Sequence, residues 1–287
     1  MGTLFAMNDK TVLITGCSSG IGYCVAQGLK QRGYGVIATA RCTEDVARLR
    51  EEGFDALQLD LDDSASIRQA LAQAAAQAPQ GIYGLFNNGA WGLPGAVEDL
   101  SREALRAQFE TNLFGTMELT NRMIRLMRVR GGGRIIQNSS VLGLVAFPYR
   151  GAYNASKFAL EGMTDTLRME LRGSGIHISL IEPGPIVSRF RENAFRRYQQ
   201  YIAKDDSAHR SQYEAMEQRL LKEGPAAPFT LPPEAVLAKV VHALESPRPR
   251  IRYYVTFPTW LFAVLRRLLP AGLLDRALIK ASGDGSR

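Results

Sequence analysis

A tyrosine and a lysine four residues apart, Tyr153 and Lys157, form the pair best suited to acid–base chemistry in this chain. Residues at i and i+4 share one face of a helix, so a helix predicted over 151–173 would set the ammonium beside the phenol. Because this spacing often arises by chance, its place at the start of a helix carries the argument. We expect Lys157 to favour the phenolate and to lower the pKa of Tyr153 from its usual value near 10.

A glycine-rich turn follows the first predicted strand and leads directly into a helix, over residues 15–22. Backbone N–H groups and the positive end of the helix dipole together attract a pyrophosphate. Gly16 permits the tight turn, and Gly20 and Gly22 allow close backbone approach. A purely structural turn is the alternative, which the preceding strand and the following amphipathic helix disfavour. The predicted cofactor-binding residues here are Gly16, Ser18, Ser19, Gly20, Ile21 and Gly22.

The end of the second predicted strand bears on the choice between NAD and NADP. An acidic residue there would bind the ribose 2′-hydroxyl, but the strand ends Ala38-Thr39-Ala40-Arg41 and offers no carboxylate. Arg41 instead supplies a guanidinium fork suited to a 2′-phosphate, with Ser18 and Thr39 as helpers. The alternative is a surface arginine that follows a strand. The sequence therefore favours NADP(H).

The elements that must position these residues alternate between short apolar runs and helical stretches, which is typical of a parallel sheet with crossover helices. We predict an α/β fold: a single Rossmann-type doubly wound parallel sheet of about seven strands flanked by helices, in one domain over 1–287, with the cofactor-binding and catalytic core at 10–182. Strands are expected at 11–15, 35–40, 55–60, 82–86, 134–139, 177–182 and about 251–256, and helices near 20–32, 43–52, 63–78, 101–130, 151–173 and 232–245.

Two segments lie outside this alternation. Residues 186–231 read as a polar, mostly helical insertion over the active site, whose aromatic side chains would line a pocket for an apolar carbonyl compound. These are Phe190, Phe195, Tyr198 and Tyr201. Residues 257–282 predict an amphipathic helical tail interrupted at Pro270, suited to the substrate mouth or an anionic bilayer surface. Core packing or a dimer contact explains the tail equally well.

Composition limits the classes of partner. With 46% hydrophobic and 22% charged residues among 287, the chain is an ordinary globular protein. Its net charge of +7 is spread over several arginine groups, so solvated faces are favoured over a nucleic-acid groove, and we expect no nucleic acid partner. A phosphate-bearing cofactor or a membrane surface would still benefit from this positive field.

Cysteine, histidine and apolar patterns bear on metal binding and compartment. Cys17, Cys24 and Cys42 form no disulfide framework, which indicates a reducing, cytoplasmic setting. The three histidines are too scattered for a zinc site, so no metal is predicted. The first ten residues lack a signal pattern and no run is long and apolar enough to span a membrane. We expect a cytoplasmic protein, with peripheral contact at the inner face of the membrane as an extension.

Taken in order, the motifs resemble the short-chain dehydrogenase/reductase family of the NADP-preferring type. More narrowly, the chain resembles bacterial NADP-dependent aldehyde reductases and the hydroxysteroid and retinol dehydrogenase branches. The residues that carry the resemblance are TGCSSGIG at 15–22, Asp60-Leu61, Asn87-Asn88, Asn112 in TNLFG, Ser140, YNASK at 153–157 and PGPIVS at 183–188.

This resemblance implies hydride exchange between NADP(H) and an aldehyde or ketone, in either direction. It assigns Ser140 to the substrate carbonyl, Tyr153 to protonation of the developing alkoxide, Lys157 to the nicotinamide ribose and Asn112 to a water of the proton relay. It also implies a homodimer or homotetramer built from paired helices. The cofactor positions implied beyond the glycine-rich turn are Asp60 and Leu61 at the adenine, Asn88 at the adenosine side, and Ile186 and Ser188 at the carboxamide.

One departure from the family pattern concerns the segment Asn87-Asn88-Gly89-Ala90, where the family usually reads N-N-A-G. The swap moves the residue able to adopt positive φ by one position, with a consequence for cofactor affinity. It supports an alternative of another class, a non-catalytic NADPH-binding sensor. Retention of all four catalytic positions opposes that reading. A second alternative is an enzyme for membrane-derived lipids or sterols.

Overall fold

A computed structural model describes residues 10–224 and 227–283; residues 1–9, where no targeting signal was expected, lie outside the described part. Seven strands form one sheet in the order β3-β2-β1-β4-β5-β6-β7, and every neighbouring pair is parallel. This confirms the predicted doubly wound sheet, which reverses its strand order between β1 and β4. The strands are β1 (Thr11–Ile14), β2 (Gly35–Ala40), β3 (Asp55–Gln58), β4 (Ile82–Asn87), β5 (Gly133–Asn138), β6 (Ile176–Glu182) and β7 (Arg252–Tyr254).

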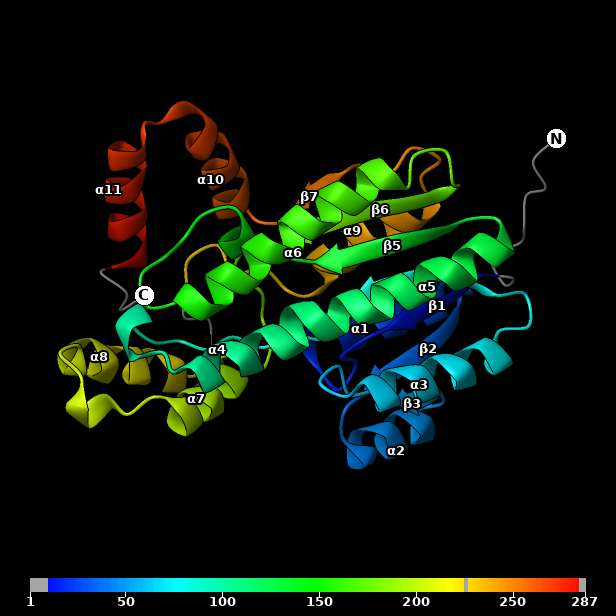
Figure 1. Cartoon of the computed structure of the whole chain (residues 1–287), viewed down its shortest axis with the longest axis horizontal. Helices are drawn as coiled ribbons and strands as arrows, with labels where there is room; N and C mark the ends of the chain where they lie inside the picture. Colours follow the sequence, from blue (N-terminus) through cyan, green and yellow to red (C-terminus); the bar gives the residue numbers. More distant parts are fainter. Residues whose placement is uncertain (1–9, 225–226, 284–287) are drawn as a thin grey trace.

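Helices cover both faces of the sheet, which explains why its strands are apolar on both sides. One apolar cluster joins the sheet to α1 (Gly20–Gln31), α2 (Thr43–Glu51) and α9 (Glu234–Glu245). A second joins the opposite face to α3 (Ser64–Gln77), α5 (Thr116–Arg130) and α6 (Gly151–Glu170), and Figure 1 shows α5 and α6 crossing in front of the sheet.

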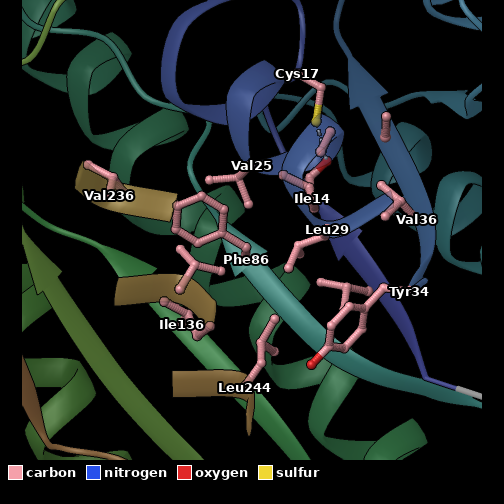
Figure 2. Packing of buried hydrophobic residues seen from close by; sticks show 14 of the residues in the cluster. Ile14, Cys17, Val25, Leu29, Tyr34, Val36, Phe86, Ile136, Val236 and Leu244 are labelled. Carbon is pink, nitrogen blue, oxygen red and sulfur yellow. Dashed lines mark hydrogen bonds between the residues drawn. The ribbon is translucent and has the colours of Figure 1, made fainter. Parts of the chain in front are cut away.

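The first cluster fixes the start of the cofactor-binding unit. Figure 2 shows Val25 and Leu29 of α1 directed toward Phe86 of β4, with Val236 and Leu244 approaching from α9. All five side chains are fully buried. Burying side chains of this size stabilises the fold by about 1.5–3 kcal/mol each. The helix that follows the glycine-rich turn is therefore held rigidly against the sheet.

The helix predicted over 101–130 is not a single regular α-helix. It consists of α4 (Arg102–Phe109), a π-helical segment η3 (Glu110–Gly115) and α5. A Cβ on Gly115 would lie 1.8 Å from the backbone oxygen of Leu61, so the wider turn brings the helix against the chain that follows β3. Such π segments often occur at functional sites, and this one carries Asn112.

The two remaining segments lie at the end of the molecule toward which the β5 arrow points in Figure 1. The insertion forms α7 (Phe190–Tyr201), a short 3₁₀ turn and α8 (Arg210–Leu221). The tail forms α10 (Phe257–Leu268) and α11 (Ala271–Ser282), separated at Pro270 as the sequence predicts. Within the described residues, no helix combines the length and the apolar character needed to cross a membrane.

Candidate active site

The crevice where the strand order reverses is closed by hydrogen bonds between the ends of β1 and β4. Thr15 Oγ1 accepts from the backbone N–H groups of Asn88 at 2.9 Å and Gly89 at 2.8 Å. Asn88 Nδ2 donates to the carbonyl oxygens of Thr15 at 3.0 Å and Gly16 at 3.1 Å. Ligands of doubly wound sheets bind outside the strand ends at this point, so the predicted position of Asn88 is at the expected crevice.

The glycine-rich turn leaves the N-terminus of α1 open to an anion. Gly16 and Gly20 adopt positive φ of 71° and 57°. Ser19 precedes the helix without a capping hydrogen bond from its side chain, and no acidic residue occupies the first turn. Unpaired N–H groups at such a terminus suit a phosphate, so the residues present fit a dinucleotide.

Gly22 permits close packing within the protein. A Cβ there would lie 2.2 Å from the Gly16 carbonyl oxygen and 2.6 Å from Asn88 Nδ2. The missing side chain therefore lets helix α1 pack against its own turn and against β4. The predicted cofactor contact of Gly22 stays a prediction.

Two arginines lie at the edge of the turn near the end of β2. Arg41 follows β2 and is exposed, as predicted. Arg48 of α2, which the sequence reasoning missed, donates from Nη2 to the Ser18 carbonyl at 2.7 Å. The expectation for Thr39 was wrong, because its side chain is fully buried and donates to the Ile14 carbonyl at 3.0 Å. The only sequence signal for Arg48 is a basic residue on the helix that follows Arg41.

The predicted adenine and carboxamide residues lie around the same crevice. Leu61 packs close to Gly89: its Cδ1 is 3.2 Å from the position that a Cβ on Gly89 would take. Ser188 packs close to Gly20 in the same way, with its Cβ 3.0 Å from the position of a Cβ on Gly20. Asp60 Oδ1 accepts from Asp62 N at 3.0 Å, which fixes this loop after β3. Ile186 is held by a parallel bridge to Leu231 at the far end of the insertion.

Tyr153, Ser140 and Lys157 converge where β5 ends and α6 begins. Tyr153 is in the first turn of α6, and Ser140 precedes a 3₁₀ turn, η4 (Val141–Gly143), which follows β5. Ser140 Oγ accepts from Leu142 N at 3.1 Å and hydrogen-bonds to the Tyr153 phenol. Lys157 Nζ donates to the Asn138 carbonyl at 2.7 Å and lies 5.7 Å from the centre of the Tyr153 ring. The predicted helix face is thus confirmed.

The pKa values of this group differ from the sequence expectation. Burial raises the pKa of Tyr153 to about 12, although its hydrogen bond with Ser140 opposes the shift. Burial also lowers the pKa of Lys157 to about 8, against the charge of Glu161, which raises it. The expected lowering of the tyrosine pKa by Lys157 was wrong for the protein alone, because loss of solvent around the phenol dominates.

Apolar side chains surround Tyr153, and some of them come from the tail. The sequence had predicted only that the tail lies at the substrate mouth. Tyr153 belongs to a cluster that contains Phe262 of α10 and Leu278 of α11. Phe190 also contacts it, with ring centroids 5.4 Å apart. The other predicted pocket aromatics pack elsewhere: Phe195 stacks on Tyr198, Tyr198 packs against Tyr213, and Tyr201 stacks on Trp91. The η4 members of the cluster are Val141 and Leu142, with Val145 just beyond.

Residues 10–199 match the family model described as short chain dehydrogenase. The chain belongs to this family.

Relatives of this short-chain dehydrogenase extend the match over nearly its whole length. The uncharacterized oxidoreductase YbbO of Escherichia coli K12 is 45% identical over 270 residues, 94% of each chain. Human 17-beta-hydroxysteroid dehydrogenase type 1 is 34% identical, over 87% of this chain and 78% of the relative. A solved short-chain dehydrogenase/reductase from Burkholderia phymatum in complex with NAD is 26% identical, with a TM-score of 0.76 over 92% and 94% of the two chains.

The departure of this short-chain dehydrogenase at Gly89 does not move a left-handed residue. Tyr149 and Phe229 are the only non-glycine residues with positive φ in the described chain, and Gly89 itself has none. A Cβ on Gly16 would meet the Gly89 Cα at 2.9 Å. Two glycines therefore pass each other closely at the crevice, and the expected change in backbone freedom does not occur.

Asn112 adds a positioning role to the one the family resemblance implies. Its carboxamide accepts from Trp91 N at 3.1 Å and donates to Trp91 O at 2.8 Å and Ser156 Oγ at 3.1 Å. It thereby joins the loop after β4 to α6 beside Tyr153. The water-holding role of Asn112 stays a prediction. In residues 10–224 and 227–283, no three His, Cys, Asp or Glu side chains are grouped to hold a metal, and the absence of a metal also stays a prediction.

Proposed function

We propose that this oxidoreductase is an NADPH-dependent reductase of apolar aldehydes or ketones, with Tyr153 as the general acid. The observation that carries the proposal is the position of the Tyr153 phenol. It lies beside Ser140 and Lys157, and Tyr153 belongs to an apolar cluster completed by the tail. A small reactive polar group within an apolar enclosure suits a carbonyl attached to an apolar body.

The residues of the chain divide the work of reduction. Bound NADPH supplies the hydride. As negative charge develops on the substrate oxygen, the Tyr153 phenol donates its proton there. The Ser140 oxygen accepts from Leu142 N and keeps its own hydroxyl proton, which it donates as a second hydrogen bond to the substrate oxygen. A pKa of about 12 keeps the phenol protonated at neutral pH, so the proton needed for reduction is present.

The preference for NADPH rests on charge at the end of β2. A solved family member binds NAD, so membership alone leaves the choice open. Here Arg41 replaces the acidic residue that would bind the ribose 2′-hydroxyl. Arg48 adds a second guanidinium beside Ser18, although Asp45 and Glu52 also pair with it. Two guanidinium groups at one edge favour a cofactor with an additional phosphate.

We further propose that the substrates reach the site from a membrane surface. Phe229, Phe257 and Trp260 are 59%, 54% and 52% exposed and contact one another, with ring centroids 5.4 Å and 6.3 Å apart. Arg266 and Arg267 are exposed on the same helix, α10. Exposed aromatic rings near cationic side chains suit the interface of an anionic bilayer. Three free cysteines fit a cytoplasmic protein that contacts the inner face of the membrane.

Relatives with apolar substrates support this class. One relative, human 17-beta-hydroxysteroid dehydrogenase type 1, is named for a hydroxysteroid substrate. A second candidate function is therefore dehydrogenation or reduction of hydroxysteroids, retinoids or other membrane-derived lipids. The Tyr153 cluster with Phe262 favours such a substrate over a small polar one.

One assay separates these possibilities. We would measure turnover of medium- and long-chain aldehydes, ketosteroids and retinal, each with NADPH and with NADH. We expect NADPH-dependent reduction that improves with apolar length. NADPH binding without turnover of any carbonyl in the panel would instead support the sensor alternative.

A further inference from the structure

Four titratable residues follow one another at intervals of four along α6. Tyr153, Lys157, Glu161 and Asp165 therefore share one helix face. Lys157 and Glu161 are buried, with 2% and 6% exposure, whereas the Asp165 side chain is 36% exposed. The row runs from the active-site phenol toward the surface, and the proposed mechanism uses only its first two members.

Arg252 of β7 binds three carboxylates around the lower part of this row. Its Nη1 contacts Glu161 and Glu182, and its Nη2 lies 2.6 Å from Asp165 Oδ2. Glu182 ends β6 and is fully buried. Beyond these groups, Tyr254 of β7 also interacts with the charges of both glutamates. Three carboxylates around one guanidinium leave an excess of negative charge inside the protein.

A glycine fixes Glu161 against the active-site turn. A Cβ on Gly143 would lie 3.0 Å from Glu161 Cγ, 3.1 Å from Glu161 Oε1 and 2.7 Å from Ser139 Oγ. Gly143 belongs to the η4 turn that Ser140 begins. The carboxylate is therefore packed directly behind the turn that positions the catalytic serine.

The positive charge of Lys157 balances the excess negative charge of the three carboxylates around Arg252. Desolvation raises the pKa values of Glu182 and Glu161. The charge of Glu161 adds to the rise at Glu182, the charge of Asp165 adds to the rise at Glu161, and Arg252 opposes both. One negative charge shared by the two glutamates then remains, opposite the buried ammonium of Lys157. The Glu161 charge in turn raises the pKa of Lys157, against the effect of burial.

We propose that Glu161 is a positioning residue: its carboxylate, held by Arg252 beside Glu182, is the counter-charge that keeps Lys157 protonated in its buried site. The inference deepens the proposed function, because a protonated Lys157 is the form that would bind the cofactor ribose and act on Tyr153. It concerns the lysine itself, however, and can be tested without cofactor or substrate.

The experiment is a pH titration of ¹³Cε-lysine-labelled protein by NMR. The chain has only seven lysines, and Lys157→Met identifies the resonance of interest. Glu161→Gln keeps the side-chain shape and removes the charge, so the Lys157 midpoint should fall by about one pH unit. Glu182→Gln confines the shared charge to Glu161, so the midpoint should stay at or above the parent value. Glu170→Gln, an exposed change on the same helix, is the matched control.

The outcomes separate the inference from the proposed function. A lower Lys157 midpoint in Glu161→Gln, with no such change in Glu182→Gln, supports the inference. If NADPH affinity is unchanged in the same variant, the inference still stands, but the cofactor-binding role given to Lys157 is wrong. An unchanged midpoint in Glu161→Gln overturns it. A downward shift in Glu182→Gln as large as that in Glu161→Gln also overturns it, because a general loosening of the buried cluster would then explain both. If Glu161→Gln does not fold, Glu182→Gln decides the matter: a Lys157 midpoint at or above the parent value supports the inference, and a lower midpoint overturns it.

Discussion

The Arg48 guanidinium donates a 2.7 Å hydrogen bond to the carbonyl of Ser18, which links α2 to the glycine-rich turn. This contact holds the positive charge of Arg48 next to Ser18, the residue before the N-cap of α1. Arg41 lies at the end of the neighbouring strand and is free to extend into solvent. The two arginines therefore differ in how firmly they are held.

Both arginines should contribute to cofactor choice. Arg41→Asp should narrow or invert the preference for NADPH over NADH, because it restores an acceptor for the ribose 2′-hydroxyl. Arg48→Gln should weaken NADPH binding by about tenfold and leave NADH binding nearly unchanged, as expected for loss of one charge-assisted hydrogen bond. Fluorescence titration measures both, with the exposed Arg32→Gln as control. Equal affinities for the two cofactors in the parent protein would falsify the idea.

Removing the phenol should abolish turnover without abolishing cofactor binding. Tyr153→Phe keeps the ring in its apolar cluster but removes the transferable proton, so kcat should fall by at least about 100-fold. Lys157→Ala should reduce both kcat and NADPH affinity. Steady-state assays and fluorescence titration provide the two readouts. Near-parent turnover in Tyr153→Phe would show that another group is the acid.

NADPH affinity should depend on pH through Lys157. Burial lowers the pKa of Lys157 to about 8 in the free protein, so the ammonium is present below that pH and is lost above it. The dissociation constant should rise by about twofold from pH 7 to 8 and then by up to tenfold per unit as the ammonium loses its proton. Lys157→Ala should bind more weakly and without this alkaline rise. A parent protein with pH-independent binding up to pH 9.5 would contradict the assignment.

The exposed aromatic group on the tail should control membrane binding. Phe257→Ser together with Trp260→Ser should reduce co-sedimentation with vesicles that contain anionic lipid and should lower activity toward long-chain substrates. Val129→Ser is the matched control, because Val129 is 91% exposed but lies at the C-terminal end of α5. These substitutions leave the buried part of the tail intact, including Phe262 in the cluster that contains Tyr153. If the parent protein ignores anionic vesicles, the surface needs another partner.

The long helices should form a symmetric dimer interface. Phe114 is 52% exposed beside a surface hollow of about 460 Å³ on α5, and Met163 is 46% exposed on α6. Phe114→Glu with Met163→Glu should convert a dimer or tetramer to smaller species in light scattering. Leu221→Glu, at a 63% exposed position on α8, should leave the assembly intact. A parent protein that is monomeric at micromolar concentration would remove this proposal without affecting the chemistry.

The sequence by itself determined the parts of this protein that depend on local order along the chain. The apolar runs predicted all seven strands, and the turn between β1 and α1 predicted the phosphate site. The spacing of Tyr153 and Lys157 predicted their shared helix face, because four residues complete about one helical turn. These features need only short-range periodicity and the conformational freedom of glycine.

Only the tertiary structure decided which distant residues meet. Arg48 reaches Ser18 from another helix, Phe262 joins the cluster around Tyr153 from the tail, and Arg252 reaches Glu161 from the last strand. The same packing raised the pKa of Tyr153 instead of lowering it, because burial outweighs the hydrogen bond with Ser140. The π segment at Asn112 also lies where the helix meets the loop after β3. Such contacts join residues far apart in the chain, and desolvation depends on the whole surrounding core, so local sequence patterns do not encode them.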